Sequence, residues 1–170
     1  MKVLNKIFKC EVCGNENLKS VLKLGNHPMC DDLIRVGDPR KCKEYPIEIL
    51  YCNVCRTGHQ KFQVPKEELF PKSYHYRSRF TADVLSGMSG LVDSCEKKFG
   101  NLDQKIVLDI GCNDGSLLDF FKQKGSVTIG IEPTDASRDA KAKGHDVFSD
   151  YLSVDLAREI LKTYGHPAII

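Results

Sequence analysis

The sequence predicts an α/β protein in which a small metal-centred β domain precedes a connecting helix and a parallel sheet. Three observations carry this prediction. Two C-x-x-C pairs lie within the first 55 residues, a helical apolar period begins near residue 77, and apolar strands alternate with helices from residue 105 onward.

The N-terminal part, residues 1–64, has short apolar pieces with scattered Gly and Pro and no sustained helical period. Residues 45–52 (YPIEILYC) and 59–64 (HQKFQV) alternate well enough to predict two strands. We predict a zinc-binding domain over 1–64, followed by a linker with two prolines over 65–76.

An amphipathic helix is expected between Arg77 and Gly100, so that linker and helix together occupy residues 65–100. Gly100 is well suited to end this helix. The apolar residues that recur mostly at three- and four-residue steps are Phe80, Val84, Met88, Leu91, Val92, Cys95 and Phe99.

The remaining residues, 101–170, alternate in the β-α-β order that is typical of a parallel, Rossmann-like sheet. A doubly wound domain usually continues for several more units, so we expect a truncated sheet whose missing part lies on a longer chain or on a partner chain. The predicted strands are 105–110, 127–132, 146–150 and 167–170, and the predicted helices are 116–125, 135–144 and 153–165.

The charge and the apolar runs narrow the class of protein. The net charge is +2, with eleven Lys and Arg against seven Asp and Glu in residues 1–64, which is too weak a bias to favour nucleic acid. No apolar run is long enough to span a membrane, and no signal-like apolar core precedes Cys10. We therefore expect a cytoplasmic protein.

Four cysteines have the spacing C-x2-C-x38-C-x2-C, which predicts one Zn²⁺ held by Cys10, Cys13, Cys52 and Cys55. Four sulfur ligands leave no open position for water, so the metal would be structural and would stabilise the small domain by roughly 10–16 kcal/mol. A redox role for the pairs is the weaker alternative. Because four sulfurs already complete the site, we expect His59 to be a strand or loop histidine, with an extra ligand as the alternative. The other four cysteines are expected to be plain thiols.

A glycine turn follows the strand at 105–110. Asp109, Gly111 and Gly115 form a D-x-G-x-x-x-G pattern, and Glu132 ends the next strand, where a carboxylate can reach a ribose diol. The turn lacks both the P-loop G-K-[ST] and the nicotinamide-type G-x-G-x-x-G. An acidic turn suits S-adenosylmethionine (SAM), which carries a sulfonium and an ammonium and no phosphate. A purely structural turn remains the alternative.

Several motifs together resemble the zinc-containing sugar C-methyltransferases of deoxysugar biosynthesis, whose SAM-binding domain is Rossmann-like (class I). They are VLDIGCNDGSLL (107–118), GIEP (130–133) and the upstream cysteines, with weaker similarity at LGNHPMCDDLI (24–34) and YHYRS (74–78). The resemblance covers the whole chain as the N-terminal portion of such an enzyme.

The resemblance implies roles for individual residues. Asp109, Gly111, Asn113 and Gly115 would surround the methionine tail of SAM, Glu132 would bind the ribose, and Asp150 would lie near the adenine. Tyr74 and Tyr76 would lie near the sugar, although packing of the linker is an alternative for them.

The resemblance also implies a reaction on a nucleotide-linked keto-deoxysugar. A base removes a proton next to the ketone, and the enolate attacks the sulfonium methyl group. We assign no catalytic base, because we expect it beyond residue 170, and we therefore expect the 170-residue chain alone to be inactive. His75 is not assigned to this role.

Two other functions compete with this one. An RNA methyltransferase with an N-terminal zinc ribbon would share the metal and SAM but would need a basic surface. A non-catalytic zinc-binding module, or a remnant of a larger enzyme, would keep the metal without affinity for SAM.

Overall fold

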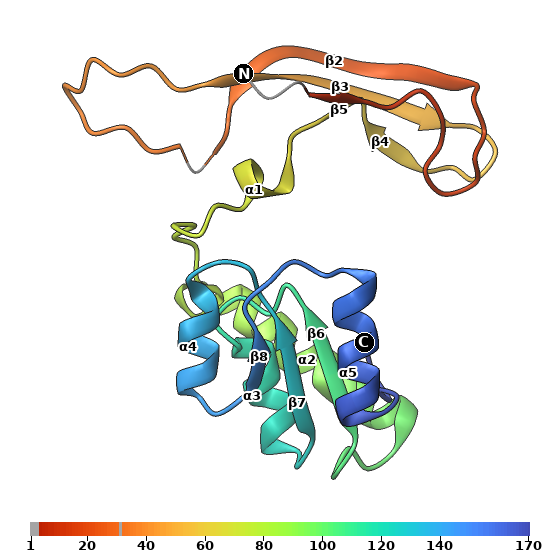
Figure 1. The fold of residues 1–170 in the computed structure, drawn as a ribbon, viewed down its shortest axis with the longest axis vertical. Helices are drawn as coiled ribbons and strands as arrows, with labels where there is room; N and C mark the ends of the chain where they lie inside the picture. Colours follow the sequence, from red (N-terminus) through yellow and green to blue (C-terminus); the bar gives the residue numbers. More distant parts are fainter. Residues whose placement is uncertain (1–3, 31) are drawn as a thin grey trace. The chain divides into compact units, whose positions relative to one another are not determined.

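The computed structural model describes residues 4–30 and 32–170 (Figure 1). Contacts within the chain separate it into two compact units, residues 1–69 and residues 70–170. The predicted division into 1–64, 65–100 and 101–170 stays a prediction. Among the described residues, no helix is long and apolar enough to cross a membrane.

The first unit is built from short antiparallel sheets. One sheet has the strand order β2-β3-β4, and a second pairs β1 with β5. Lys61 separates β4 from β5, so the strand predicted over 59–64 is two short strands with different partners. The strands are β1 (Asn5–Lys6), β2 (Leu18–Pro28), β3 (Glu44–Cys52), β4 (Gly58–Gln60) and β5 (Phe62–Gln63).

Strand β2 is a finding of the structure that sequence periodicity does not predict. Its register against β3 shifts between Ser20 and Leu22 and again between Lys23 and Gly25. Each shift inserts an extra residue and breaks the two-residue alternation from which a strand is recognised. All of its residues after Leu18 are also exposed, so no buried face marks it in the sequence.

The linker and the connecting helix differ in detail from the prediction. The linker contains one helical turn, α1 (Lys66–Leu69), and the connecting helix α2 runs over Ala82–Phe99. It begins later than Arg77 because η1 (Ser78–Phe80) is a separate 3-10 turn and the backbone of Thr81 is extended. Gly100 ends α2 with a φ of 75°.

The second unit contains a parallel sheet with the strand order β6-β7-β8, which confirms the predicted fold class. Ile169 forms a parallel bridge to Val107 on the free edge of β6, and so a fourth chain segment lies beside β6. The strands are β6 (Ile106–Ile110), β7 (Val127–Ile131) and β8 (Asp146–Phe148).

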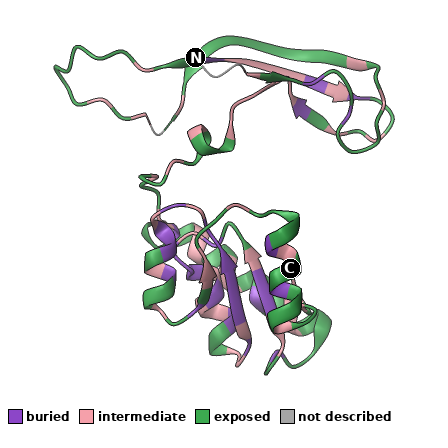
Figure 2. Ribbon diagram, viewed as in Figure 1, coloured by how far each residue is buried: buried purple, intermediate pink, exposed green. Residues whose placement is uncertain are grey.

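Helices cover both faces of this sheet. The neighbours Val107 and Leu108 point to opposite faces, where Val107 packs with residues of α2, α3 and α4 and Leu108 packs with residues of α5. Buried residues are accordingly concentrated in β6, β7 and the helix faces that they meet (Figure 2). The helices are α3 (Ser116–Gln123), α4 (Ala136–Ala142) and α5 (Val154–Tyr164).

This topology fixes where a ligand can bind. The chain leaves β6 toward β7 on one side and returns to the other side of β6 at Ile169, after α5 has crossed to the opposite face. Such a reversal of strand order opens a crevice at the carboxyl ends of the strands. The glycine turn after β6 and Glu132 after β7 both lie at these ends.

Candidate metal centre and cofactor site

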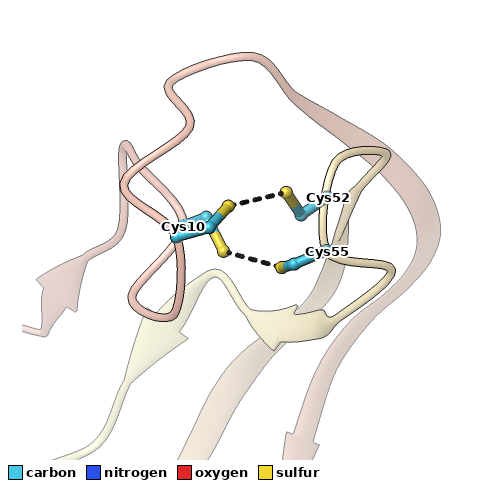
Figure 3. A group of neighbouring side chains, drawn as sticks. Cys10, Cys52 and Cys55 are labelled. Atoms are coloured by element: carbon cyan, nitrogen blue, oxygen red, sulfur yellow. Dashed lines mark hydrogen bonds between the residues drawn. The ribbon is translucent and has the colours of Figure 1, made fainter.

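The first unit brings its four predicted metal ligands together. The sulfur atoms of Cys10, Cys13, Cys52 and Cys55 all lie within 4.8 Å of one another. Two turns present the pairs face to face (Figure 3), with 3.4 Å between the sulfurs of Cys10 and Cys55 and 3.6 Å between those of Cys13 and Cys52. Tetrahedral zinc with Zn–S bonds near 2.3 Å needs sulfurs about 3.8 Å apart, so the cluster fits a zinc ion.

Polar groups around the cluster favour the thiolate form of Cys52 and Cys55, whereas burial and the neighbouring cysteines raise the pKa of Cys13 to about 12. A ring nitrogen of the buried His59 lies 3.2 Å from the sulfur of Cys10, and the amide of Asn15 donates to Cys52 at 3.4 Å. The backbone N–H of Cys55 and the Asn15 amide lower the pKa of Cys52 to about 6. His59 thus lies beside the four sulfurs, where a ring N–H can support a ligand thiolate.

The second unit has a cavity of about 420 Å³ at the carboxyl ends of β6, β7 and β8. None of the described residues that line it is Lys, Arg or His, and two of them are acidic. It is lined by Phe70, Tyr74, Tyr76, Ser78, Ile110, Gly111, Asn113, Ile131, Glu132, Pro133, Thr134, Asp150, Tyr151 and Leu152. Six of the predicted site residues are therefore in its wall, and Asp109 and Gly115 are not.

Glu132 is buried and held on both carboxylate oxygens. Its Oε2 accepts a hydrogen bond from the backbone N–H of Asn113 at 3.0 Å. Its Oε1 accepts from the backbone N–H and the hydroxyl of Thr134 at 2.9 and 2.5 Å. The carboxylate keeps lone pairs for a ligand, and its orientation toward the cavity is fixed before any ligand binds.

Asp109 lies one residue before the end of β6, next to the cavity wall rather than in it. Burial, and then the negative charge of Glu132, raise the pKa of Asp109 to about 6. A cation placed beside both carboxylates would relieve this repulsion. The pair therefore favours a positively charged ligand group over an anionic one.

Asn113 and Asp114 bind the segment that precedes α2. The side chain of Asn113 accepts from the backbone N–H of Ser78 at 3.0 Å and donates to the carbonyl of Tyr76 at 3.2 Å. The fully buried Asp114 accepts from the backbone N–H of Arg79 at 3.1 Å. Residues 74–80, called the tyrosine segment below, are thereby attached to the glycine turn.

The glycines of the turn have different structural roles. Gly111 has a φ of 85°, and a Cβ built on it would meet no atom within 4 Å. A Cβ on Gly115 would lie 2.8 Å from His145 and 3.0 Å from the Cβ of Ala140. Gly111 thus leaves room at the cavity wall, whereas Gly115 allows α3 to pack closely against α4 and the chain beyond it.

Aromatic rings form another part of the cavity wall. The rings of Phe70 and Tyr74 meet edge to face, with 5.7 Å between centroids, and the hydroxyl of Tyr151 donates to the carbonyl of Phe70 at 2.8 Å. Asp150 accepts from the backbone N–H of Tyr151 at 2.7 Å. His75 is not among the residues that line this cavity.

Two polar residues that shape the site are absent from the sequence prediction. Thr134 follows Glu132 by two residues, and a hydroxyl at that spacing commonly bonds back to a neighbouring side chain or backbone group. Asp114 stands two residues before Ser116 and accepts from its N–H and hydroxyl at 3.2 and 2.6 Å. An Asx turn at the start of a helix was the available signal for Asp114.

Comparisons with known proteins agree with the two-part organisation. Residues 10–70 match a family model described as "Putative zinc binding domain". Over 165 residues the chain is 24% identical to C-methyltransferase NovU of Streptomyces niveus, covering 96% of this chain and 39% of that relative. The match to the zinc-binding family model includes the four cysteines that cluster in the structure. Within the segment 24–34, Asp31 lies outside the described residues. The chain thus resembles the N-terminal portion of a zinc-containing C-methyltransferase.

Proposed function

We propose, from this resemblance to the N-terminal portion of a C-methyltransferase, that the chain binds SAM in the cavity of its second unit and serves methyl transfer to carbon. Zinc, held by Cys10, Cys13, Cys52 and Cys55, would stabilise the first unit. The acceptor that we propose is a nucleotide-linked keto-deoxysugar. Because the chain spans 39% of the relative's length, this activity is proposed for the protein as a whole.

The observation that carries the proposal is the charge of the cavity. Glu132 and Asp150 line it, Asp109 lies beside it, and none of the described residues in its wall is basic. A dinucleotide needs positive or N–H-rich surroundings for its pyrophosphate. SAM brings two cationic groups and a ribose, which suit buried carboxylates at the strand ends.

The chain's own residues would bind and orient SAM in this scheme. Glu132 would accept hydrogen bonds from the ribose hydroxyls, and Asp109 would attract the cationic methionine portion. Asp150 would lie near the adenine, and Gly111 would let the ligand approach the turn. Tyr74 and Tyr76, on the aromatic wall, would face the methyl acceptor.

The reaction transfers one methyl group from sulfur to carbon. A base removes a proton from the carbon next to the ketone, and the resulting enolate attacks the methyl carbon of SAM. A C–C bond forms as the S–C bond breaks, its electron pair stays on sulfur, and neutral S-adenosylhomocysteine leaves. We assign no described residue as the base.

Calorimetry tests the cofactor proposal directly. We expect SAM and S-adenosylhomocysteine to bind the folded protein and NAD to show no binding at the same concentrations. Binding of NAD in place of SAM, or binding of neither in a sample whose fold is verified by circular dichroism, would overturn it.

A labelled-methyl assay tests the acceptor class. Because the activity is proposed for the protein as a whole, SAM with a labelled methyl group is incubated with a full-length protein that extends this chain to the relative's length. The acceptors are a panel of nucleotide-linked 4-keto-deoxysugars, with RNA as the comparison. We expect label in the sugar fraction with the full-length protein and none with the 170-residue chain alone. Label in RNA alone would show the acceptor class to be wrong.

A further inference from the structure

The tyrosine segment, residues 74–80, is bound to the glycine turn through one side chain in particular. Asn113 uses both ends of its amide on this segment, accepting from Ser78 N–H at 3.0 Å and donating to Tyr76 O at 3.2 Å. Ser78 is buried, so its N–H depends on that bond in the described structure.

The same residue is bound to the carboxylate at the end of β7. The backbone N–H of Asn113 donates to Oε2 of Glu132 at 3.0 Å. Asn113 adopts a φ of 50°, in the left-handed region, and this conformation directs its N–H toward Glu132 while its side chain meets the segment. One residue therefore joins Glu132 to the stretch of chain that carries Tyr74 and Tyr76.

Both tyrosines belong to the cavity wall, together with Asn113 and Glu132. A ligand bonded to Glu132 would restrain its carboxylate, and a restrained carboxylate would hold the Asn113 turn. The turn in turn holds the backbone at Tyr76 and Ser78. Opening of the tyrosine segment would therefore disturb the ligand site. The free energy of this opening should be higher when the ligand is bound.

We propose that Asn113 is a positioning residue that couples occupancy of the cofactor site at Glu132 to the placement of the tyrosine segment, and hence of Tyr76 in the cavity wall. This inference rests on the proposed function, because it takes SAM as the ligand at Glu132. It assigns a role to the Asn113 side chain that differs from contact with the methionine tail.

Amide hydrogen exchange with and without SAM tests the coupling. At a SAM concentration of 100 times its Kd, hydrogen exchange through an opening that abolishes SAM binding slows by about 100-fold. We expect ligand-dependent slowing at Ser78 N–H in the wild-type protein. Thr134 N–H, which donates to Glu132 Oε1, serves as the internal reference because it reports on the ligand site itself.

Two variants separate the coupling from general stability. Asn113→Gly tolerates the positive φ and removes both side-chain bonds, so Ser78 should lose its ligand-dependent slowing while Thr134 keeps it. Asn113→Asp keeps an acceptor for Ser78 N–H and should retain the slowing.

The outcomes are distinguishable. SAM-dependent slowing at Thr134 but not at Ser78 in the wild-type protein would overturn the coupling and leave the cofactor proposal intact. Equal slowing at Ser78 in wild type and Asn113→Gly would overturn the role of Asn113. Slowing at neither amide, with no calorimetric binding, would overturn the proposed function and this inference together.

Discussion

The hydroxyl and the backbone N–H of Thr134 both donate to the same oxygen of Glu132, at 2.5 and 2.9 Å. With the N–H of Asn113 on the other oxygen, the carboxylate is oriented by three donors from two loops. Such preorganisation spares a ligand the cost of ordering the group that binds it.

Replacing Glu132 with Ala should weaken SAM binding by about 1–3 kcal/mol, which is roughly 5- to 150-fold in Kd, because a charged acceptor for the ribose is lost. Calorimetry measures the change. Thr134→Val is the matched control, since it removes one orienting bond and keeps the charge, and it should cause a smaller loss. Wild-type affinity in a folded Glu132→Ala protein would refute the ribose role.

The affinity for SAM should depend on pH through Asp109. Burial and the charge of Glu132 raise the pKa of Asp109 to about 6, and a cationic ligand prefers the ionised acid. Affinity should therefore rise as the pH increases through about 6. One pH unit below that pKa, the affinity should be about tenfold weaker than its limit at high pH. Asp109→Asn should flatten this profile in calorimetric titrations, and an unchanged profile in that variant would contradict the assignment.

Asp109 should have the opposite effect on the stability of the free protein. Its folded pKa lies above the ordinary value of 3.8, so the folded state disfavours the ionised form. On this group alone, the free energy of unfolding falls as the pH rises from about 4 to about 6. Urea unfolding of wild type and Asp109→Asn across this range measures how the free energy of unfolding depends on pH. The dependence due to Asp109 should be lost below about pH 4, where the group is protonated in both the folded and the unfolded state.

The metal should be essential to the first unit. We expect one zinc per chain in protein purified without chelator, and a Cys52→Ser variant should unfold residues 1–69 while leaving residues 70–170 less affected. Cys10 and Cys52 are buried and belong to the small core of that unit, so loss of the metal would remove much of what holds the core together. Metal analysis and hydrogen exchange resolved by segment check it, and less than half an equivalent of zinc would contradict it.

Gly115→Ala and Gly111→Ala form a matched pair. Both glycines have a positive φ, which costs an alanine about 1–2 kcal/mol. Only Gly115 adds close contacts, at 2.8 Å from His145 and 3.0 Å from Ala140, and overpacking costs about 1–3 kcal/mol more. Gly115→Ala should therefore be the more destabilising variant in urea unfolding. Equal losses would show that packing at Gly115 is looser than described.

The parallel sheet could be predicted from sequence because its strands are buried and its helices end at glycines. Val107 and Leu108 pack on opposite faces, which gives the continuous apolar run expected of such a strand. Strand β2 could not be predicted, because its bulges break the alternation and its residues are exposed. The helix α2 begins later than its apolar spacing predicts, because that spacing cannot distinguish a 3-10 turn from the start of a helix.

The metal centre could also be predicted from the sequence, whereas parts of the cofactor site could not. Cysteine spacing alone predicted a cluster that the structure brings within 4.8 Å. The parts of the cofactor site that sequence did not reveal are contacts between distant segments, such as Asn113 with Ser78 and Asp114 with Arg79. No local pattern encodes a partner 35 residues away along the chain, and so these roles needed the folded structure.

The crossing of α5 to the opposite face of the sheet has a consequence for how this binding site can change during evolution. The crevice exists because the backbone reverses its winding direction beside β6, and no single side-chain substitution alters that path. Substitutions in the wall can exchange one ligand chemistry for another, but the location is inherited with the topology. Divergent descendants of this chain should therefore bind different molecules at one and the same place.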